Sequence, residues 1–221
     1  MDGNLKIVDL TRPLRPETPV FLGDPPITLA RVADHNADGY EVTQICLGSH
    51  SGTHLDAPRH FFPEGATLSD YPIERLIAEG VVLDVRSAPA GIVGRDLLAA
   101  RLEQWPVKRG DFVLLWTGMA AENATEALQG ATLSPAAAAL LIDLGVALVG
   151  TDGAGLDLEG ESYPVHRLLL GAGVLLAENL CNLELLGPGR VQCVFLPLAL
   201  EDTDGAPVRA VAWRLPAESP F

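Results

Sequence analysis

Four side chains that can bind a metal ion or transfer protons lie close together in this sequence: His50, His54, Asp56 and His60. The whole chain has only five histidines, so three of them gathered in one short stretch stand out from the composition. Imidazole and carboxylate groups bind borderline metal ions without thiolates, and a further imidazole can move protons near neutral pH. The cluster therefore predicts a metal site, and a hydrolytic metal site is the leading hypothesis for its function.

The spacing of these residues indicates how the chain runs between them. All four positions are even, so an extended strand would place their side chains on one face. Full extension would separate the Cα atoms of His50 and His54 by about 13 Å, at the limit for two imidazoles that share one ion. We therefore expect the chain to curl there, with Gly52 supplying the freedom and Pro58 fixing a second bend. A helix is not predicted, because both Gly52 and Pro58 disfavour one.

The elements that must position the cluster alternate between strands and helices. Apolar, β-rich segments predict strands over residues 40–48, 81–85, 111–117, 146–151, 173–177, 191–200 and 208–214. Helices are predicted over residues 72–79, 95–104 and 136–144. The short polar segment before the last strand is typical of an antiparallel hairpin. This order favours a mixed α/β domain, with the histidine cluster following the end of the first strand.

Local signals mark the ends of two helices. Ser134 suits the cap before the helix over residues 136–144, Pro135 suits its first position, and Gly145 suits its exit. Gly80 is expected to end the helix over residues 72–79 as a left-handed cap. The proline-rich segment over residues 13–26 cannot form a continuous helix and is expected to be an ordered arm.

Length and charge limit the possible partners. A chain of 221 residues is long enough for one well-cored domain, so we expect a single domain over residues 1–221 with an N-terminal arm over residues 1–30. Its net charge of -14 would repel a phosphate backbone or an anionic membrane surface, which disfavours both as partners. A small-molecule substrate is the partner that a hydrolytic site requires.

The remaining composition predicts a cytoplasmic homo-oligomer. The three cysteines, Cys46, Cys181 and Cys193, are far apart and lack the spacing of a disulfide framework. The N-terminus lacks a secretion signal, and no apolar run approaches the roughly 18 residues of a membrane span. A hydrophobic content of 48% is high for so charged a chain, which suggests a buried subunit interface. A generous core with alanine-rich helices is the alternative explanation.

The segment from His50 to His60 reads His-x-Gly-Thr-His-x-Asp-Ala-Pro-x-His, and it resembles the signature of the cyclase family of metal-dependent hydrolases, which includes bacterial kynurenine formamidases. The resemblance covers essentially the whole chain. Its further segments are residues 9–11, 19–24, 150–152, 164–166, 178–180, 196–198 and 205–210. It implies a swivelling β/β/α fold and a homodimer or homotetramer.

The resemblance also implies a role for each site residue. His50, His54 and Asp56 would hold one metal ion. Asp56 would bridge to a second ion held by His166 and Glu178, and His60 would be the catalytic acid and base. The implied cofactor is Zn²⁺, as one or two ions per subunit, with Mn²⁺ also possible. The expected reaction is hydrolysis of an amide, formamide, cyclic amide or lactone by metal-activated water.

The N-terminal arm carries the main difference from that family. Kynurenine formamidases that resemble this chain usually place a tryptophan and then a proline where this sequence has Phe21 and Leu22. We therefore take Phe21 as the candidate substrate contact, and expect the substrate to be decided by the arm.

Two other functions remain open at this point. His54 and Asp56 together with His166 also fit the two-histidine, one-carboxylate triad of non-haem iron oxygenases, although this leaves His50, His60 and Glu178 without a role. The third possibility is a non-catalytic binding protein on the same fold. Oxygen-independent hydrolysis would exclude the oxygenase, and any hydrolysis of an amide or lactone would exclude the non-catalytic binding protein.

Overall fold

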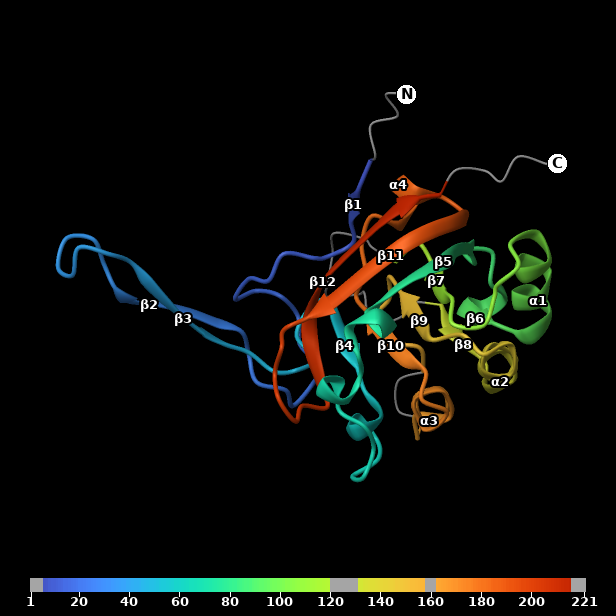
Figure 1. Cartoon of the computed structure of the whole chain (residues 1–221), viewed down its shortest axis with the longest axis horizontal. Helices are drawn as coiled ribbons and strands as arrows, with labels where there is room; N and C mark the ends of the chain where they lie inside the picture. The colour runs from blue at the N-terminus through green and yellow to red at the C-terminus, as the bar shows by residue number, and fades with distance from the viewer. Residues whose placement is uncertain (1–5, 120–130, 158–161, 216–221) are drawn as a thin grey trace.

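A computed structural model describes residues 6–119, 131–157 and 162–215, which form a mixed α/β fold around one large sheet (Figure 1). The main sheet has eight strands in the order β1-β12-β11-β5-β7-β9-β10-β4. In chain order these are β1 Val8–Asp9, β4 His54–Asp56, β5 Ile77–Asp84, β7 Phe112–Trp116, β9 Leu148–Thr151, β10 Leu175–Glu178, β11 Gly189–Pro197 and β12 Gly205–Arg214. The helices are α1 Arg95–Gln104, α2 Pro135–Leu144, α3 Pro164–Gly171 and α4 Leu183–Leu186, with short 3-10 turns η1 Pro58–His60, η2 Leu68–Asp70, η3 Ile73–Leu76 and η4 Pro89–Gly91.

The four central strands β5, β7, β9 and β10 are parallel to one another. Their sequences are nearly continuous apolar runs, because both faces of a parallel sheet are covered. The flanking strands β11 and β12 are antiparallel, which confirms the terminal hairpin expected from the sequence. Strand β4 pairs with both β10 and β12, so the sheet curls until its two sides meet at β4.

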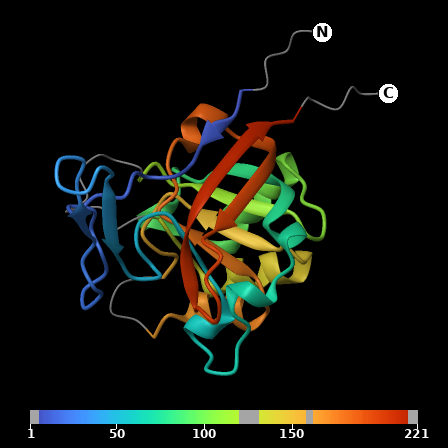
Figure 2. The same ribbon diagram turned by 60° about the vertical axis from the view of Figure 1, so that its left-hand side comes forward.

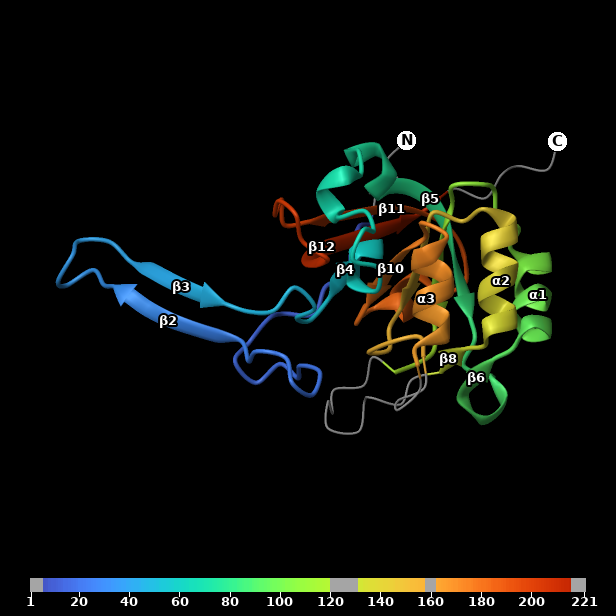
Figure 3. The same cartoon turned by 90° about the horizontal axis from the view of Figure 1, so that it is seen from below.

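Residues on β5 alternate between two hydrophobic cores. Val82 belongs to the core that lies against Phe195 of β11, whereas Val81 and Leu83 belong to the core under the helices. Helices α1, α2 and α3 gather on one side of the sheet in Figures 1 and 3, and Figure 2 shows β11 and β12 (orange and red) in front of the central strands. Two strand layers and a helix layer result, which confirms the expected β/β/α fold.

Helices with complete local signals form where the sequence predicts them. Helix α1 has the predicted bounds, and α2 begins after Ser134, whose Oγ accepts a hydrogen bond from the Ala137 N–H. Gly145 ends α2 in the left-handed conformation, with φ at +72°. A serine at such a cap contributes about 1 kcal/mol to helix stability. Helix α2 buries Ala137 and Leu141 against the sheet.

The predicted helix over residues 72–79 is wrong in length and in its ending. Only the short 3-10 turn η3 forms there, and β5 already begins at Ile77. Gly80 lies inside β5 and is not a helix cap. A Cβ atom at Gly80 would lie 2.5 Å from the Phe112 carbonyl oxygen, so glycine is needed because β5 and β7 approach closely there.

Strands β2 (Thr28–Ala33) and β3 (Val42–Cys46) form a separate two-stranded sheet that extends away from the rest of the domain (Figures 1 and 3). The sequence predicted a strand over residues 40–48 but not its partner β2, because residues 28–33 carry little apolar alternation. A second small sheet pairs β6 (Ile92–Val93) with β8 (Thr132–Leu133). Within the described ranges, no helix is long and apolar enough to cross a bilayer.

Candidate metal centre

Strand β4 carries two members of the histidine cluster between two neighbouring strands. Pairing with β10 places His54 opposite Glu178, and pairing with β12 places Asp56 opposite Gly205. His54 and Asp56 are two residues apart, so they share one face of β4, while Leu55 between them is fully buried in the core. Closure of the sheet by β4 therefore brings Glu178 and the start of β12 to the cluster.

The chain curls between His50 and His54, as the spacing predicts. Gly52 has a φ of +63°, in the left-handed region that favours glycine. Pro58 begins the turn η1, which ends at His60. As a result, the ring centroid of His50 lies 5.0 Å from that of His54 and 3.9 Å from that of His60.

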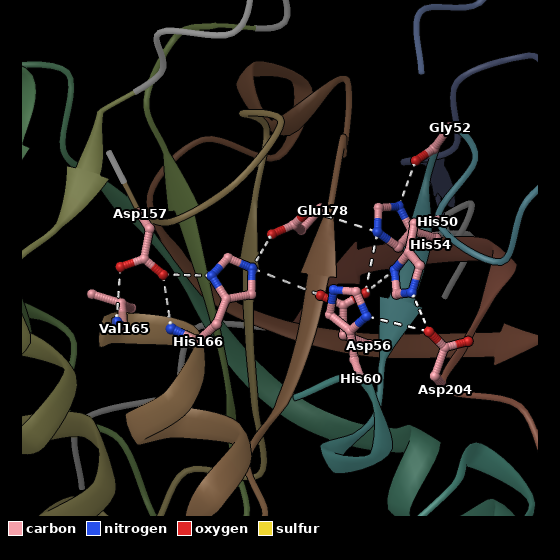
Figure 4. Close-up of polar contacts among 10 residues, drawn as sticks. All are labelled: His50, Gly52, His54, Asp56, His60, Asp157, Val165, His166, Glu178 and Asp204. Atoms are coloured by element: carbon pink, nitrogen blue, oxygen red, sulfur yellow. Dashed lines mark hydrogen bonds and ion pairs between the residues drawn. The ribbon is translucent and has the colours of Figure 1, made fainter. Parts of the chain in front are cut away.

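His50 contacts a carboxylate through each ring nitrogen (Figure 4). Its Nδ1 lies 2.7 Å from Oδ1 of Asp56, and its Nε2 lies 2.9 Å from Oδ2 of Asp204. Asp204 directly precedes Gly205, the residue at which β12 pairs with β4. A Cβ atom at Gly205 would lie 2.8 Å from Cε1 of His50, so the imidazole packs directly on the β12 backbone.

His54 is buried, and both of its ring nitrogens have polar partners. Its Nδ1 lies 2.8 Å from the Gly52 carbonyl oxygen, which can only accept, so Nδ1 carries a proton. Its Nε2 lies 3.2 Å from Oδ1 of Asp56 and 3.6 Å from Oε2 of Glu178. The Gly52 carbonyl thus turns Nε2 of His54 towards both carboxylates.

His166 reaches the cluster from helix α3. Its Nε2 lies 2.9 Å from Oε1 of Glu178 and 3.9 Å from Oδ2 of Asp56. Its Nδ1 lies 2.5 Å from Oδ2 of Asp157, whose carboxylate also accepts the backbone N–H groups of Val165 and His166. Asp157 therefore fixes both the start of α3 and the orientation of the His166 ring.

Three histidines share one arrangement, in which one nitrogen points to Asp56 or Glu178 and the other to an outer acceptor (Figure 4). The histidines are His50, His54 and His166, and their outer acceptors are Asp204, the Gly52 carbonyl and Asp157. Histidines that ligate metal ions almost always donate their second nitrogen to a carboxylate or carbonyl in this way. The donor set therefore fits a metal ion in its orientation as well as in its residue types.

Asp56 provides a second indication that a cation fits here. Its side chain is fully buried, yet Oδ2 has no hydrogen-bond partner among the described residues. A buried carboxylate oxygen without a partner is costly, and a metal ion would satisfy it. Ligand atoms of His54, Asp56 and Glu178 lie within 4.8 Å of one another, as do those of His50, Asp56 and His60.

The carboxylates around His50 favour its charged form when no cation is present. Burial opposes a charged imidazole, but the hydrogen bonds to Asp204 and Asp56 outweigh burial and raise the pKa of His50 from 6.5 to about 10. Conversely, the hydrogen bonds from His50 and His60 hold the pKa of Asp204 well below its usual range. This side of the site is a compact ionic network with an ionised carboxylate at its edge.

Burial and hydrogen bonding also have opposite effects on the pKa values of the residues near α3. Burial opposes the charge on His166, but the hydrogen bonds to Asp157 and Glu178 outweigh it and raise the pKa of His166 to about 10. Burial also opposes ionisation of Asp157, yet its hydrogen bonds with His166 and Val165 lower its pKa. Without a metal, protons on these histidines compensate the negative charge of the site.

His60 lies at the rim of the cluster and is partly exposed to solvent. Its Nδ1 lies 3.2 Å from Oδ2 of Asp204, and its ring contacts Phe61 edge to face at 4.7 Å. The Phe61 ring lies 5.6 Å from that of Tyr163, and Tyr163 lies 6.0 Å from His166. Phe61 and Tyr163 form an aromatic wall beside the cluster.

Phe21 lies outside this arrangement. It begins a turn that closes with a hydrogen bond from the Asp24 N–H to the Phe21 carbonyl, and its side chain is about half exposed. No ring contact in the described part of the chain joins Phe21 to a cluster histidine. Its role as a substrate contact stays a prediction.

The structure brings all six sequence-predicted cluster residues together and adds two acidic residues that the sequence did not single out, Asp157 and Asp204. Asp204 stands in the polar segment before the last predicted strand, but its contact with His50 depends on the pairing of β12 with β4, which the sequence does not reveal. Asp157 has no short-range signal, because it lies nine residues before His166, beyond the reach of a local motif.

Comparison with known proteins gives a consistent result. A family model described as "Putative cyclase" matches residues 8–158. The chain is 31% identical over 211 residues to a kynurenine formamidase from Salinibacter ruber, covering 94% of this chain and 97% of that protein. It is also 31% identical over 226 residues to a kynurenine formamidase from Paracidovorax citrulli, covering 95% and 96%.

Solved structures with the same fold include hydrolases. An isatin hydrolase bound to the product analogue thioisatinate superposes with a TM-score of 0.86 at 25% identity, covering 96% of this chain and 93% of that one. A potential metal-dependent hydrolase with cyclase activity superposes with a TM-score of 0.80 at 30% identity, covering 96% and 100%.

Proposed function

This chain belongs to the cyclase family, and from that premise we propose that it is a metal-dependent hydrolase that cleaves an amide carbon–nitrogen bond. The observation that carries the proposal is the shared arrangement of His50, His54 and His166. Each directs one nitrogen to the buried pair Asp56 and Glu178 and has the other held from outside. Three imidazoles oriented in this way around two carboxylates are suited to divalent cations.

We assign the ligands as the sequence suggests. His50, His54 and Asp56 would hold one ion, and Asp56 would extend to a second ion with His166 and Glu178. Glu178 supports this division because its two oxygens reach different histidines, Oε2 towards His54 and Oε1 towards His166. The set contains nitrogen and oxygen donors without thiolate, which favours Zn²⁺ first and Mn²⁺ as the alternative.

A bound divalent ion lowers the pKa of a coordinated water towards about 7 and polarises a nearby carbonyl group. His60 is placed to handle the protons of the reaction. It is the most exposed histidine of the cluster, and Asp204 holds its Nδ1, so the imidazole orientation is fixed. His60 would accept a proton from the attacking water and return it to the leaving nitrogen. The alternative is that His60 is itself a metal ligand, because its ligand atom lies within 4.8 Å of those of His50 and Asp56.

The aromatic wall favours a substrate with an aryl group. Phe61 and Tyr163 lie next to His60 and His166, so a planar ring bound against them would present its amide to the cluster. The relatives named above are enzymes of kynurenine and isatin, both of which are aromatic compounds. We propose that Phe21 on the arm is a further substrate contact and that the reaction takes a small aromatic amide or cyclic amide.

The oxygenase alternative accounts for fewer of these residues. It would use His54, Asp56 and His166 and leave Glu178 idle, although Glu178 lies between both of these histidines. A purely binding function gives no reason for an exposed imidazole oriented by Asp204 at the rim. Hydrolysis uses every polar residue of the cluster.

The experiment compares metal-stripped protein with protein reloaded separately with Zn²⁺ or Mn²⁺, on N-formylkynurenine, isatin and a simple lactone. We expect the reloaded protein to hydrolyse at least one of the two amides, with the same rate in the absence of oxygen. Full activity in the stripped protein, or no hydrolysis of either amide with either metal, would contradict the proposal. Elemental analysis of the protein as purified identifies the native ion.

A further inference from the structure

A hydrogen-bond network lies directly beyond the ligand pair His54 and Glu178, where the pairing of β4 with β10 ends. The next residues along the two strands are Thr53 and Asn179. The Thr53 hydroxyl donates a hydrogen bond of 2.7 Å to the Asn179 carbonyl oxygen, which continues the ladder by one step. The two ligands are therefore held from their outer side by residues that do not belong to the proposed ligand set.

Arg12 joins this network from the N-terminal arm. Its backbone N–H donates to the Thr53 hydroxyl oxygen at 2.9 Å, and its Nε donates to the Asn179 carbonyl oxygen at 3.2 Å. Its Nη2 donates to the carbonyl oxygens of Asp152 and Leu180, at 2.8 and 3.4 Å. Asp152 directly follows β9 and Asn179 directly follows β10, so one guanidinium connects the carboxyl ends of two neighbouring parallel strands. The rigid fork of donors in arginine suits such a contact.

The backbone of Asn179 needs this support. Its φ is +56°, in the left-handed region that residues other than glycine enter at a cost, although asparagine tolerates it better than most. This turn redirects the chain immediately after Glu178, and the Asn179 N–H donates to the Gly153 carbonyl oxygen at 2.8 Å. Loss of the bonds to the Asn179 carbonyl would let the turn relax towards extended backbone, which rotates the peptide group next to Glu178.

The same arm segment covers the curl that presents His54. A Cβ atom at Gly52 would lie 2.3 Å from Cδ2 of Leu14, so the Leu14 side chain packs directly on the Gly52 backbone. The Gly52 carbonyl is the group that orients the His54 ring. The arm therefore contacts the backbone beside both ligands of the pair.

We propose that Arg12 is a positioning residue for the metal centre, which sets the spacing between the Glu178 carboxylate and the His54 imidazole by holding Asn179 and Thr53. Oε2 of Glu178 lies 3.6 Å from Nε2 of His54, and its Oε1 lies 2.9 Å from Nε2 of His166. A shift of the Glu178 backbone changes both distances at once. The inference rests on the proposed metal-dependent function and adds to it a residue of the arm that touches no ligand side chain.

Zinc titration of the metal-stripped protein tests the proposal. Arg12→Met keeps an unbranched apolar stem but has no hydrogen-bond donor. We expect this variant to bind Zn²⁺ about 10–100-fold more weakly than the wild type, as loss of an outer partner of a metal site typically does. Arg101→Met is the matched control, because Arg101 is also partly buried and its Nε donates to the Asp84 carbonyl oxygen, away from the cluster.

The visible absorption spectrum of protein loaded with Co²⁺ gives a readout of ligand geometry that does not depend on turnover. We expect it to change in Arg12→Met and to stay as in the wild type in Arg101→Met. Arg12→Lys is a milder variant, which keeps the positive charge but loses the fork of donors, and it should change both readouts in the same direction by less. Circular dichroism of the stripped proteins separates a change at the site from lost folding.

Variants of Asn179 test the same turn with the arm intact. Asn179→Ala should weaken Zn²⁺ binding, because alanine disfavours the left-handed backbone, and Asn179→Gly should weaken it less, because glycine does not. Arg12→Met combined with Asn179→Ala should lose less than the product of the two single losses, since both act through one turn. Independent losses in the double variant would contradict this coupling.

Unchanged Zn²⁺ affinity and an unchanged Co²⁺ spectrum in Arg12→Met and Arg12→Lys would overturn the proposal, and so would an equal effect of Arg101→Met. Failure of the proposed function gives a different result. A wild-type protein that binds no metal would overturn that function and this inference together, whereas a wild type that binds metal no more tightly than both Arg12 variants would overturn this inference alone.

Discussion

Oδ2 of Asp204 lies 3.2 Å from Nδ1 of His60. The same oxygen lies 2.9 Å from Nε2 of His50, so one carboxylate positions both a proposed metal ligand and the proposed proton carrier. Asp204 can do this because Gly205 pairs with Asp56 across β12 and β4. Asp204, the residue directly before β12, thus connects the proposed proton carrier with the metal centre, although it lies 154 residues after His50 in the chain.

Asp204→Asn should lower kcat more than it lowers metal content. The amide keeps the shape of the side chain but loses the charge that orients both imidazoles, and loss of such an outer partner typically costs 10–100-fold in activity or metal affinity. The measurement is kcat and KM on the active substrate, together with the metal stoichiometry. Asp202→Asn is the matched control, because Asp202 is an exposed neighbour whose only ion pair, with Arg59 among the described residues, is at the surface. An equal loss in both variants would exclude a positioning role for Asp204.

His60→Ala and His54→Ala should fail in different ways. His60→Ala should retain metal content near that of the wild type and lose about 10²–10⁴-fold in kcat, because a proton carrier is removed at the rim. His54→Ala should lose metal, because His54 is buried and directed at both Asp56 and Glu178. Elemental analysis and single-turnover rates separate the two. Normal turnover in His60→Ala would show that its proposed role is wrong.

The stability gained from metal should increase with pH. In the metal-free protein the pKa values of His50 and His166 are raised from 6.5 to about 10, so their protonation stabilises the fold below about pH 6.5 and this contribution is lost as pH rises towards 10. Metal binding needs the unprotonated rings, so binding becomes easier over the same range. We expect Tm of the stripped protein to fall from pH 6.5 to 9.5 while the rise in Tm on reloading grows. A metal-induced rise in Tm that does not change across this range would contradict the ionic network described here.

Gly80→Ala should destabilise the sheet and leave the geometry of the metal centre unchanged. The added Cβ would lie 2.5 Å from the Phe112 carbonyl oxygen, and overpacking of this kind costs about 1–3 kcal/mol. Gly94→Ala is the matched control, because no atom lies within 4 Å of a Cβ there and its φ is -76°. Urea unfolding should show a lower midpoint for Gly80→Ala with an unchanged slope, and a much smaller shift for Gly94→Ala. A midpoint for Gly80→Ala equal to that of the wild type would mean that β5 and β7 can separate without cost.

Local signals explain which parts of the fold were predictable. Helix α2 was predicted to within a residue because Ser134, Pro135 and Gly145 act on groups only a few residues away. The local pattern wrongly predicts a helix cap at Gly80, because glycine is needed there to let β5 approach Phe112 on the neighbouring strand, which no local pattern reveals. Strand β2 is not predicted from the sequence for a similar reason. Its pairing depends on the partner strand β3 and not on an alternating pattern of its own.

The sequence alone determined the donor types of the site and predicted the curl at Gly52, because these depend on residue identity and on spacing within a few positions, and it made hydrolysis the leading hypothesis. The fold had to supply the rest. Pairing of β4 with β10 and β12 brings Glu178 and Asp204 to the histidines, and α3 adds His166 with Asp157. Strand pairing and helix docking are selected by burial between distant segments, so the orientation of each imidazole and the projection of the hairpin emerge only when the whole chain is packed.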